Sequence, residues 1–228
     1  MRTLAELDAA VIGCRACPRL VEWRERVAVT KRAAFADDEY WAKPVPGFGA
    51  QDAALAVVGL APSAHGANRT GRMFTGDPSG DFLFRVLHEV GLATQPESRG
   101  RGDGLILRGT RLVSPVRCAP PDNRPTPAER DTCRHWLADE LALLRPTLRA
   151  VVVLGAFGWQ ALLPVLAAAG LPVPSPRPVF GHGTQVQLAD LRLFSCYHVS
   201  PRNVQTGRVT HSMVVDVLTA AASWARLV

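Results

Sequence analysis

Four short apolar runs that alternate with helix-like patterns constrain the fold of this chain more than any other feature. The runs are ALAVVG at 54–59, RLVSPV at 111–116, AVVVLG at 150–155 and LRLFSCY at 191–197. Helical patterns lie at 4–29, 81–91, 127–144, 157–169 and 210–227, and within the first of them Pro18 is expected to open a second turn of helix after the C-x-x-C. Runs of this kind are typical of strands buried on both faces, and their alternation with helices predicts an α/β domain with a mostly parallel sheet. Pro115 makes the second strand short or places it at an edge, because proline has no amide hydrogen for the ladder.

Length and composition fit one globular domain over residues 1–228. The chain is 47% hydrophobic and 20% charged, which allows a full core. No apolar run reaches the ~18 residues of a membrane span, and the start lacks the order of a signal peptide. We therefore expect a cytoplasmic monomer with no membrane partner. The net charge of +6, mostly from arginine, supports a polyanionic partner only weakly.

Four of the five cysteines have the number and chemistry of one metal centre. Cys14 and Cys17 form a C-x-x-C, and Cys118 and Cys133 follow much later, whereas Cys196 lies in an apolar run and predicts core packing. Four thiolates hold either tetrahedral zinc or an iron–sulfur cluster. The wide second spacing leans toward a cluster, since structural zinc usually takes two closely spaced pairs. A third alternative is packing or a disulfide, and spacing alone does not settle the choice.

Two unusual loops follow predicted strands. The loop at 59–80 is rich in glycine and small polar residues, and the loop at 197–208 is polar. Glycine lets backbone N–H groups approach a flat or anionic ligand closely. Because ligands of such sheets bind beyond the carboxyl ends of the strands, we expect both loops to face one site.

Several segments together bring a known family into view. They are GLAPSAHGANRTGRMFTGD at 59–77, CAPPDNRPTP at 118–127, YHVSPRNVQTGR at 197–208 and the spacing of the four cysteines. Jointly they resemble the family 5 uracil-DNA glycosylases, the broad-specificity branch related to the iron–sulfur family 4 enzymes. The resemblance implies a three-layer α/β/α sandwich with a central, mostly parallel four-stranded sheet. It also implies an N-terminal segment that helps to hold a structural [4Fe–4S] cluster, with the ligands Cys14, Cys17, Cys118 and Cys133.

The activity implied is that of a monofunctional DNA repair glycosylase. Such an enzyme flips uracil out of DNA and hydrolyses its N-glycosidic bond, which leaves an abasic site. By resemblance, Phe74 stacks on the flipped base and His198 donates a hydrogen bond to the uracil O2 as negative charge develops on the leaving base. The base pocket is then expected to include Gly59, Ala61, Ser63, Phe74, Ser114 and Asn68.

Two departures from the family pattern affect catalysis and base reading. Many relatives hold the attacking water with an acidic or amide residue in the first loop, but Leu60, Ala61 and Ser63 offer none. Asp77 is the nearest substitute, either as a water-positioning or sugar-stabilising carboxylate or as a helix N-cap. Ser114 stands where related enzymes often have asparagine, and one hydroxyl cannot read a base edge bidentately. We therefore expect uracil together with other deaminated bases, such as hypoxanthine.

The partner expected from the resemblance is DNA that contains uracil or another deaminated base. Predicted DNA contacts are Ser200, Arg202, Asn203, Thr206, Arg208, Arg69 and Arg72. For any single arginine the alternative is a solvated surface charge. Two other classes remain open at this point: a non-catalytic iron–sulfur or zinc module that binds nucleic acid, and a redox carrier in which the cluster is the active part.

Overall fold

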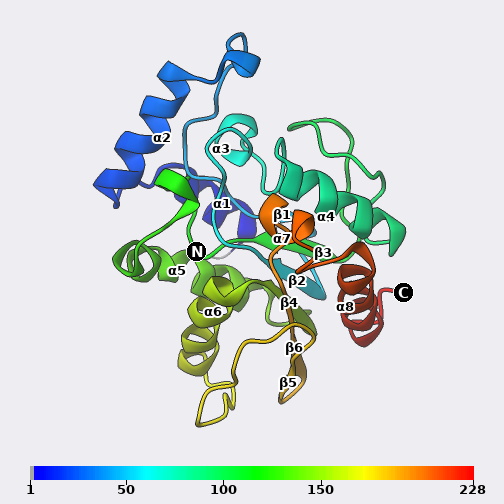
Figure 1. The fold of residues 1–228 in the computed structure, drawn as a ribbon. Helices are drawn as coiled ribbons and strands as arrows, with labels where there is room; N and C mark the ends of the chain where they lie inside the picture. Colours follow the sequence, from blue (N-terminus) through cyan, green and yellow to red (C-terminus); the bar gives the residue numbers. More distant parts are fainter. Residues whose placement is uncertain (1–2) are drawn as a thin grey trace.

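The computed structural model describes residues 3–228, and its centre is a six-stranded sheet in the order β1-β3-β2-β4-β6-β5 (Figure 1). The strands are β1 (Phe48–Gly49), β2 (Leu55–Val58), β3 (Thr110–Val113), β4 (Ala150–Leu154), β5 (Gln185–Leu188) and β6 (Leu191–Cys196). The four inner strands are parallel, and β1 and β5 pair antiparallel at the two edges. The predicted apolar runs are the four inner strands. The mostly parallel sheet is confirmed, but it has six strands and not four.

The two edge strands escaped prediction because their sequences carry no apolar run. β1 is two residues long and lies in a proline-rich stretch, while β5 carries exposed Gln185 and Gln187. β3 is short, as Pro115 predicts, and ends at Val113. It is not an edge strand, however, because β1 pairs along its outer side.

Helices cover both faces of the sheet. Leu55 and Val57 of β2 pack on one face and Ala56 and Val58 on the other. Because successive side chains of a strand point to opposite faces, one strand contributes to two hydrophobic cores. The first core includes α4 (Pro78–Glu89) and α8 (His211–Trp224). The second includes α1 (Leu4–Ile12), α5 (Pro127–Leu144) and α6 (Ala156–Ala168). Figure 1 shows these two groups on opposite sides of the strands.

The predicted helix at 4–29 is two helices in the structure. α1 ends before Gly13, and α2 (Pro18–Thr30) begins where Cys17 is the N-cap and Pro18 the first residue. Proline suits that first position because its missing N–H would have no partner there. The C-x-x-C therefore lies in the turn between the helices, and Cys17 packs against a small cluster that includes Leu20 of α2.

Short helices connect the larger elements near the carboxyl ends of the strands. They are the 3-10 turns η1 (Ala33–Phe35) and η2 (Pro121–Asn123), and the helices α3 (Ala67–Thr70) and α7 (Pro201–Gln205). α3 and α7 belong to the two loops that the sequence singles out. In the described part of the chain, no helix has both the length and the apolar character that crossing a membrane requires.

Candidate active site and cysteine centre

A cavity of about 460 Å³ opens at the carboxyl ends of the parallel strands. Its walls come from the segments that follow β2, β3 and β6, and from the N-termini of α4 and α7. This is the position at which open α/β sheets bind ligands. Of the residues predicted for the site, it is lined by Ala61, Ser63, Phe74, Asp77, Ser114, His198 and Ser200.

Phe74 occupies the cavity with a backbone conformation that is rare for a bulky residue. Its φ angle is +53°, in the left-handed region. The ring lies against Gly59, where an added Cβ would come within 2.5 Å of the Phe74 Cζ atom. Gly59 thus does not line the cavity, but it leaves the space that the ring needs.

His198 lies two residues after the end of β6, in the cavity wall. Its backbone carbonyl accepts a hydrogen bond of 2.8 Å from the Asn203 side-chain amide, which holds this part of the loop. Burial lowers the pKa of His198 below its ordinary value, and the nearby Asp77 charge opposes that shift in part. The imidazole is therefore neutral at neutral pH and presents one N–H donor.

Asp77 serves as a helix cap and as part of the cavity wall. One carboxylate oxygen accepts the backbone N–H groups of Ser79 and Gly80 at 3.0 and 3.1 Å, so the N-cap interpretation is confirmed. The other oxygen accepts the Ser63 hydroxyl. A Cβ at Gly66 would lie 2.3 Å from that second oxygen. The carboxylate is therefore held from three sides while it still borders the cavity.

Ser114 is buried at the cavity wall with its hydroxyl proton already committed. The hydroxyl donates to the Val116 carbonyl at 2.8 Å. Its oxygen lies 3.6 Å from the Met73 sulfur. Toward a ligand, Ser114 can offer only an accepting lone pair.

Two residues predicted for the site have other roles in the structure. Asn68 is fully buried and donates to the carbonyl oxygens of Arg24 and Ala64, so it does not line the cavity. Arg69 pairs with Asp38, and its guanidinium lies 3.9 Å from the Phe35 ring centroid. Each side chain supports a loop, which a sequence pattern does not distinguish from ligand contact.

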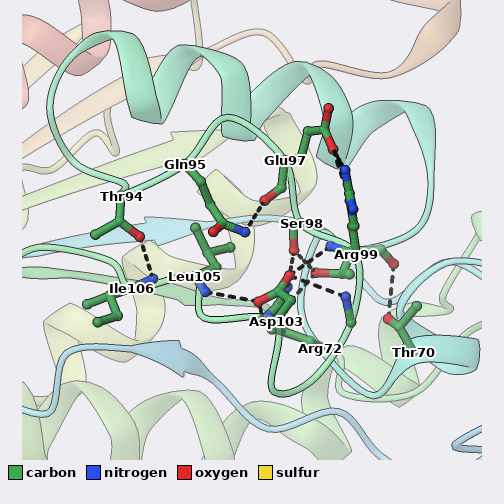
Figure 2. A network of polar contacts seen from close by, with 12 residues as sticks. Thr70, Arg72, Thr94, Gln95, Glu97, Ser98, Arg99, Asp103, Leu105 and Ile106 are labelled. Carbon is green, nitrogen blue, oxygen red and sulfur yellow. Dashed lines mark hydrogen bonds and ion pairs between the residues drawn. The ribbon is translucent and has the colours of Figure 1, made fainter.

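Arg72 is the clearest correction to the predicted DNA contacts. Its side chain is only 5% exposed and pairs with Asp103 (Figure 2). A buried guanidinium that already has a carboxylate partner is not placed to meet a DNA phosphate. Arg72 therefore belongs to the protein interior and not to the DNA-facing surface.

The loop at 197–208, which contains α7 and is called the α7 loop below, also combines an internal support with exposed side chains. Asn203 points inward to the His198 carbonyl, whereas Arg202, Thr206 and Arg208 are exposed. The guanidinium of Arg208 lies 4.9 Å from the Tyr197 ring centroid. The exposed side chains of this loop lie beside the cavity residues Ser200 and Pro201.

Sequence reasoning missed Asn123 as a cavity residue. It lies at the end of η2 with a φ angle of +55° and lines the cavity. The Asp-Asn pair between prolines was a signal for a left-handed turn, because asparagine tolerates that conformation. An asparagine side chain carries both a donor and an acceptor, whereas Ser114 offers only an acceptor.

A second cavity is lined by all four cysteines of the predicted centre, Cys14, Cys17, Cys118 and Cys133. The first two come from the turn between α1 and α2, the third from the segment after β3, and the fourth from α5. All four are free thiols. Among the described residues, no three His, Cys, Asp or Glu side chains are grouped so as to hold a metal ion.

Buried arginines surround these thiols. Arg24 is 2% exposed and donates to the Cys118 sulfur at 3.0 Å. Arg117 is 1% exposed, and its positive charge acts on Cys133. Buried N–H groups of both arginines have no hydrogen-bond partner: Arg24 Nε, and Arg117 Nε and Nη1. Because such groups are costly when unpaired, the donor set fits an anionic group with several acceptor sulfurs.

The chain also matches known proteins over nearly its whole length. The family model described as the uracil DNA glycosylase superfamily matches residues 46–221. A type-5 uracil-DNA glycosylase of Mycobacterium tuberculosis is 53% identical over 220 residues, which cover 96% of this chain and 81% of that protein. The type-5 enzyme of Thermus thermophilus is 52% identical over 216 residues, with coverage of 94% and 95%. That of Pyrobaculum aerophilum is 45% identical over 213 residues, with coverage of 93% and 89%.

Proposed function

The chain belongs to the uracil-DNA glycosylase superfamily and is a uracil-DNA glycosylase of DNA repair, and from this premise we propose how its cavity removes the base. The flipped-out uracil enters the cavity at the carboxyl ends of the strands, and water replaces the base at C1′. One observation carries this proposal. An aromatic ring, a neutral imidazole and a carboxylate, from Phe74, His198 and Asp77, line a single cavity.

The base is held by stacking and by a small number of polar groups. The Phe74 ring offers a flat apolar surface for the flipped base. Asn123 offers an amide, and Ser114 offers an acceptor only. Because Ser114 gives no bidentate contact, discrimination among bases is relaxed. We expect hypoxanthine to be accepted in addition to uracil.

His198 stabilises the leaving base. As the glycosidic bond breaks, electron density moves to the uracil oxygens, and a donor that is already oriented lowers the barrier. The lowered pKa of His198 keeps the imidazole neutral, so that it stabilises the developing charge by donating a hydrogen bond from its single N–H group. The Asn203 amide on the His198 carbonyl supports this orientation.

Asp77 acts on the sugar side. Its carboxylate can hold the attacking water or stabilise positive charge on the sugar as the base leaves. Ser63 and the α4 backbone orient the group, and negative charge near a helix N-terminus is itself favourable. One carboxylate thus serves both the fold and the reaction.

The four cysteines hold a [4Fe–4S] cluster in this proposal. Cys14, Cys17, Cys118 and Cys133 are its ligands, and Arg24 and Arg117 meet its negative charge. When bound, the cluster supplies a cross-link between distant segments and no chemistry on the base. The segment after Cys118 leads to Asn123, so this cross-link also steadies one wall of the active site.

The exposed side chains beside the cavity form the DNA interface. They are Arg202, Thr206 and Arg208 of the α7 loop and Arg124 next to Asn123, together with the half-buried Ser200 that caps α7. The enzyme leaves an abasic site without cutting the strand, because the amines of Lys31 and Lys43 do not line the cavity to form a Schiff base.

His198→Ala tests the proposed reaction. We expect uracil excision from a labelled oligonucleotide to slow by about 10²–10³-fold, the usual loss when an oxyanion donor is removed. Binding of the same DNA should remain close to that of the unmodified protein. His211→Ala, which removes an exposed imidazole in contact with Glu89, is the control. Equal losses of binding and excision in His198→Ala would contradict the role of the imidazole.

A further inference from the structure

The strained turn that carries Phe74 needs support from its surroundings. A bulky residue in the left-handed region adopts that conformation only when neighbouring contacts enforce it. The backbone oxygen of Phe74 packs against Gly80, where an added Cβ would lie at 1.7 Å. This contact prevents the turn from moving toward α4. It does not hold the turn from the opposite side.

The opposite side is held by the hydroxyl of Thr75. This residue is fully buried, and its hydroxyl donates to the Met73 carbonyl at 3.1 Å, which closes the turn around Phe74. The same oxygen accepts from Arg72 Nε at 3.2 Å and lies 2.5 Å from the Ser98 hydroxyl. Every hydrogen-bonding capacity of Thr75 Oγ1 is thus used inside the protein.

Arg72 connects this turn to a loop that lies outside the active site. Its guanidinium binds Asp103 with two nitrogens and Ser98 at 2.6 Å, as Figure 2 shows. Asp103 also accepts the backbone N–H groups of Arg99 and Leu105 at 2.9 and 3.0 Å. The hydrogen bond from Arg72, with these backbone donors, holds the Asp103 pKa well below its usual range. The loop at 94–106 is therefore fastened to the Phe74 turn by a charged, buried network.

We propose that Arg72, Thr75, Ser98 and Asp103 are positioning residues that fix the Phe74 ring in the base cavity. None of the four lines that cavity, so they act on the base only through the ring. This inference rests on the proposed stacking role of Phe74. Since a misplacement of about 1 Å in an active site can cost 10²-fold in rate, loosening the turn should slow excision more than it weakens DNA binding.

The substitutions Thr75→Val and Thr75→Ser separate the hydroxyl from the packing. Valine keeps the volume and loses the hydrogen bonds, whereas serine keeps the hydroxyl. We expect Thr75→Val to lower the single-turnover excision rate about tenfold or more with little change in KM, and Thr75→Ser to restore most of it. Wild-type excision rates in folded Thr75→Val would overturn the inference.

Asp103→Asn tests the distant end of the network, with Glu97→Gln as the matched control. Glu97 lies in the same loop but pairs with Arg99 in an exposed position. We expect slower excision in Asp103→Asn and unchanged excision in Glu97→Gln. If Asp103→Asn does not fold, the comparison of Thr75→Val with Thr75→Ser by itself tests whether the network positions the Phe74 ring.

A double-mutant cycle with Phe74→Ala distinguishes positioning from general support of the fold. If the network acts through the ring, Thr75→Val causes no further loss in the Phe74→Ala background. Fully additive losses would overturn the inference while leaving the stacking role intact. A Phe74→Ala protein that excises uracil at the normal rate would overturn the stacking role, and the inference with it.

Discussion

The base cavity and the cysteine cavity differ in how completely they are formed without a bound group. In the base cavity, Asp77 has three hydrogen-bond donors, and the Ser114 hydroxyl is satisfied by the backbone. Around the cysteines, Arg24 and Arg117 keep buried N–H groups without partners. The first site is therefore preorganised for a transient ligand. The second site retains unpaired buried N–H groups, and a permanently bound anionic group would give them hydrogen-bond acceptors.

Among the tests of this comparison, we expect the largest effect from removing one ligand of the cysteine centre. Cys133→Ser should abolish the visible absorption of an iron–thiolate centre and lower stability by several kcal/mol, on the order of 10 °C in Tm. Cys196→Ser, at a buried cysteine outside the cavity, is the control and should keep the absorption. An unchanged iron content in purified Cys133→Ser would show that this residue is not a ligand.

The effect of Arg24→Met on stability should differ in sign between the protein with its metal centre and the protein without it. In the loaded protein it removes a charge-assisted hydrogen bond and should cost about 2 kcal/mol. After chelation of the metal, it removes a buried charge with an unpaired N–H and should be neutral or stabilising. Unfolding curves of both forms measure this difference. Arg26→Met, on the exposed side of the same helix, should have little effect in either form. Equal destabilisation by Arg24→Met in both forms would break the comparison.

Gly59→Ala should slow catalysis by displacing the Phe74 ring. The new methyl group forces the ring to move, because it would lie 2.5 Å from Cζ. We expect excision to slow by about tenfold with near-normal DNA binding. Gly100→Ala is the matched control, since a Cβ there meets nothing within 4 Å. Normal excision by Gly59→Ala would show that the ring position is less critical than the preorganised cavity implies.

The smallest effect concerns pH. The His198 pKa is lowered in the folded protein, so the unfolded chain takes up the proton more readily. The stability contributed by neutral His198 is therefore complete above pH ~6.5 and is lost as the pH falls below that value. A Tm series from pH 8 to 5.5 should show a decline of a few °C that is smaller in His198→Gln, where the remainder comes from His65 and His182, whose pKa values burial also lowers. Excision should stay constant through pH ~6.5 and fall only at the lower pH at which His198 of the folded protein takes up a proton. A greater stability at pH 5.5 than at pH 8 would contradict this sign.

The inner sheet was predictable because buried parallel strands need continuous apolar runs. ALAVVG and AVVVLG became β2 and β4 within one residue of their expected ends. β5 was not predictable in this way, because its exposed Gln185 and Gln187 are held in a strand by pairing with β6. The start of helix at Pro18 was predictable, because proline suits the first helical position, but the full separation of α1 from α2 at the C-x-x-C was not.

Site residues were predictable where they follow a strand and were misassigned where they support a loop. His198 and Ser114 follow β6 and β3, so their approach to one cavity could be foreseen from topology. Arg72 and Arg69 looked like phosphate contacts, but Asp103 and Asp38 neutralise them. Those carboxylates are about thirty residues away in the sequence, and only the folded loops bring them close.

By itself, the sequence determined the α/β class, the four inner strands, the four-cysteine set and the two ligand-facing loops. These depend on local periodicity, on residue chemistry and on the rule that parallel strands end at one edge. Only the tertiary structure decided that Asn123 reaches the base cavity, that Asn68, Arg69 and Arg72 are internal supports, and that Phe74 is held in a strained turn. Each of these depends on a partner distant in the chain, and a linear pattern carries no information about which distant charge or hydroxyl a side chain will meet.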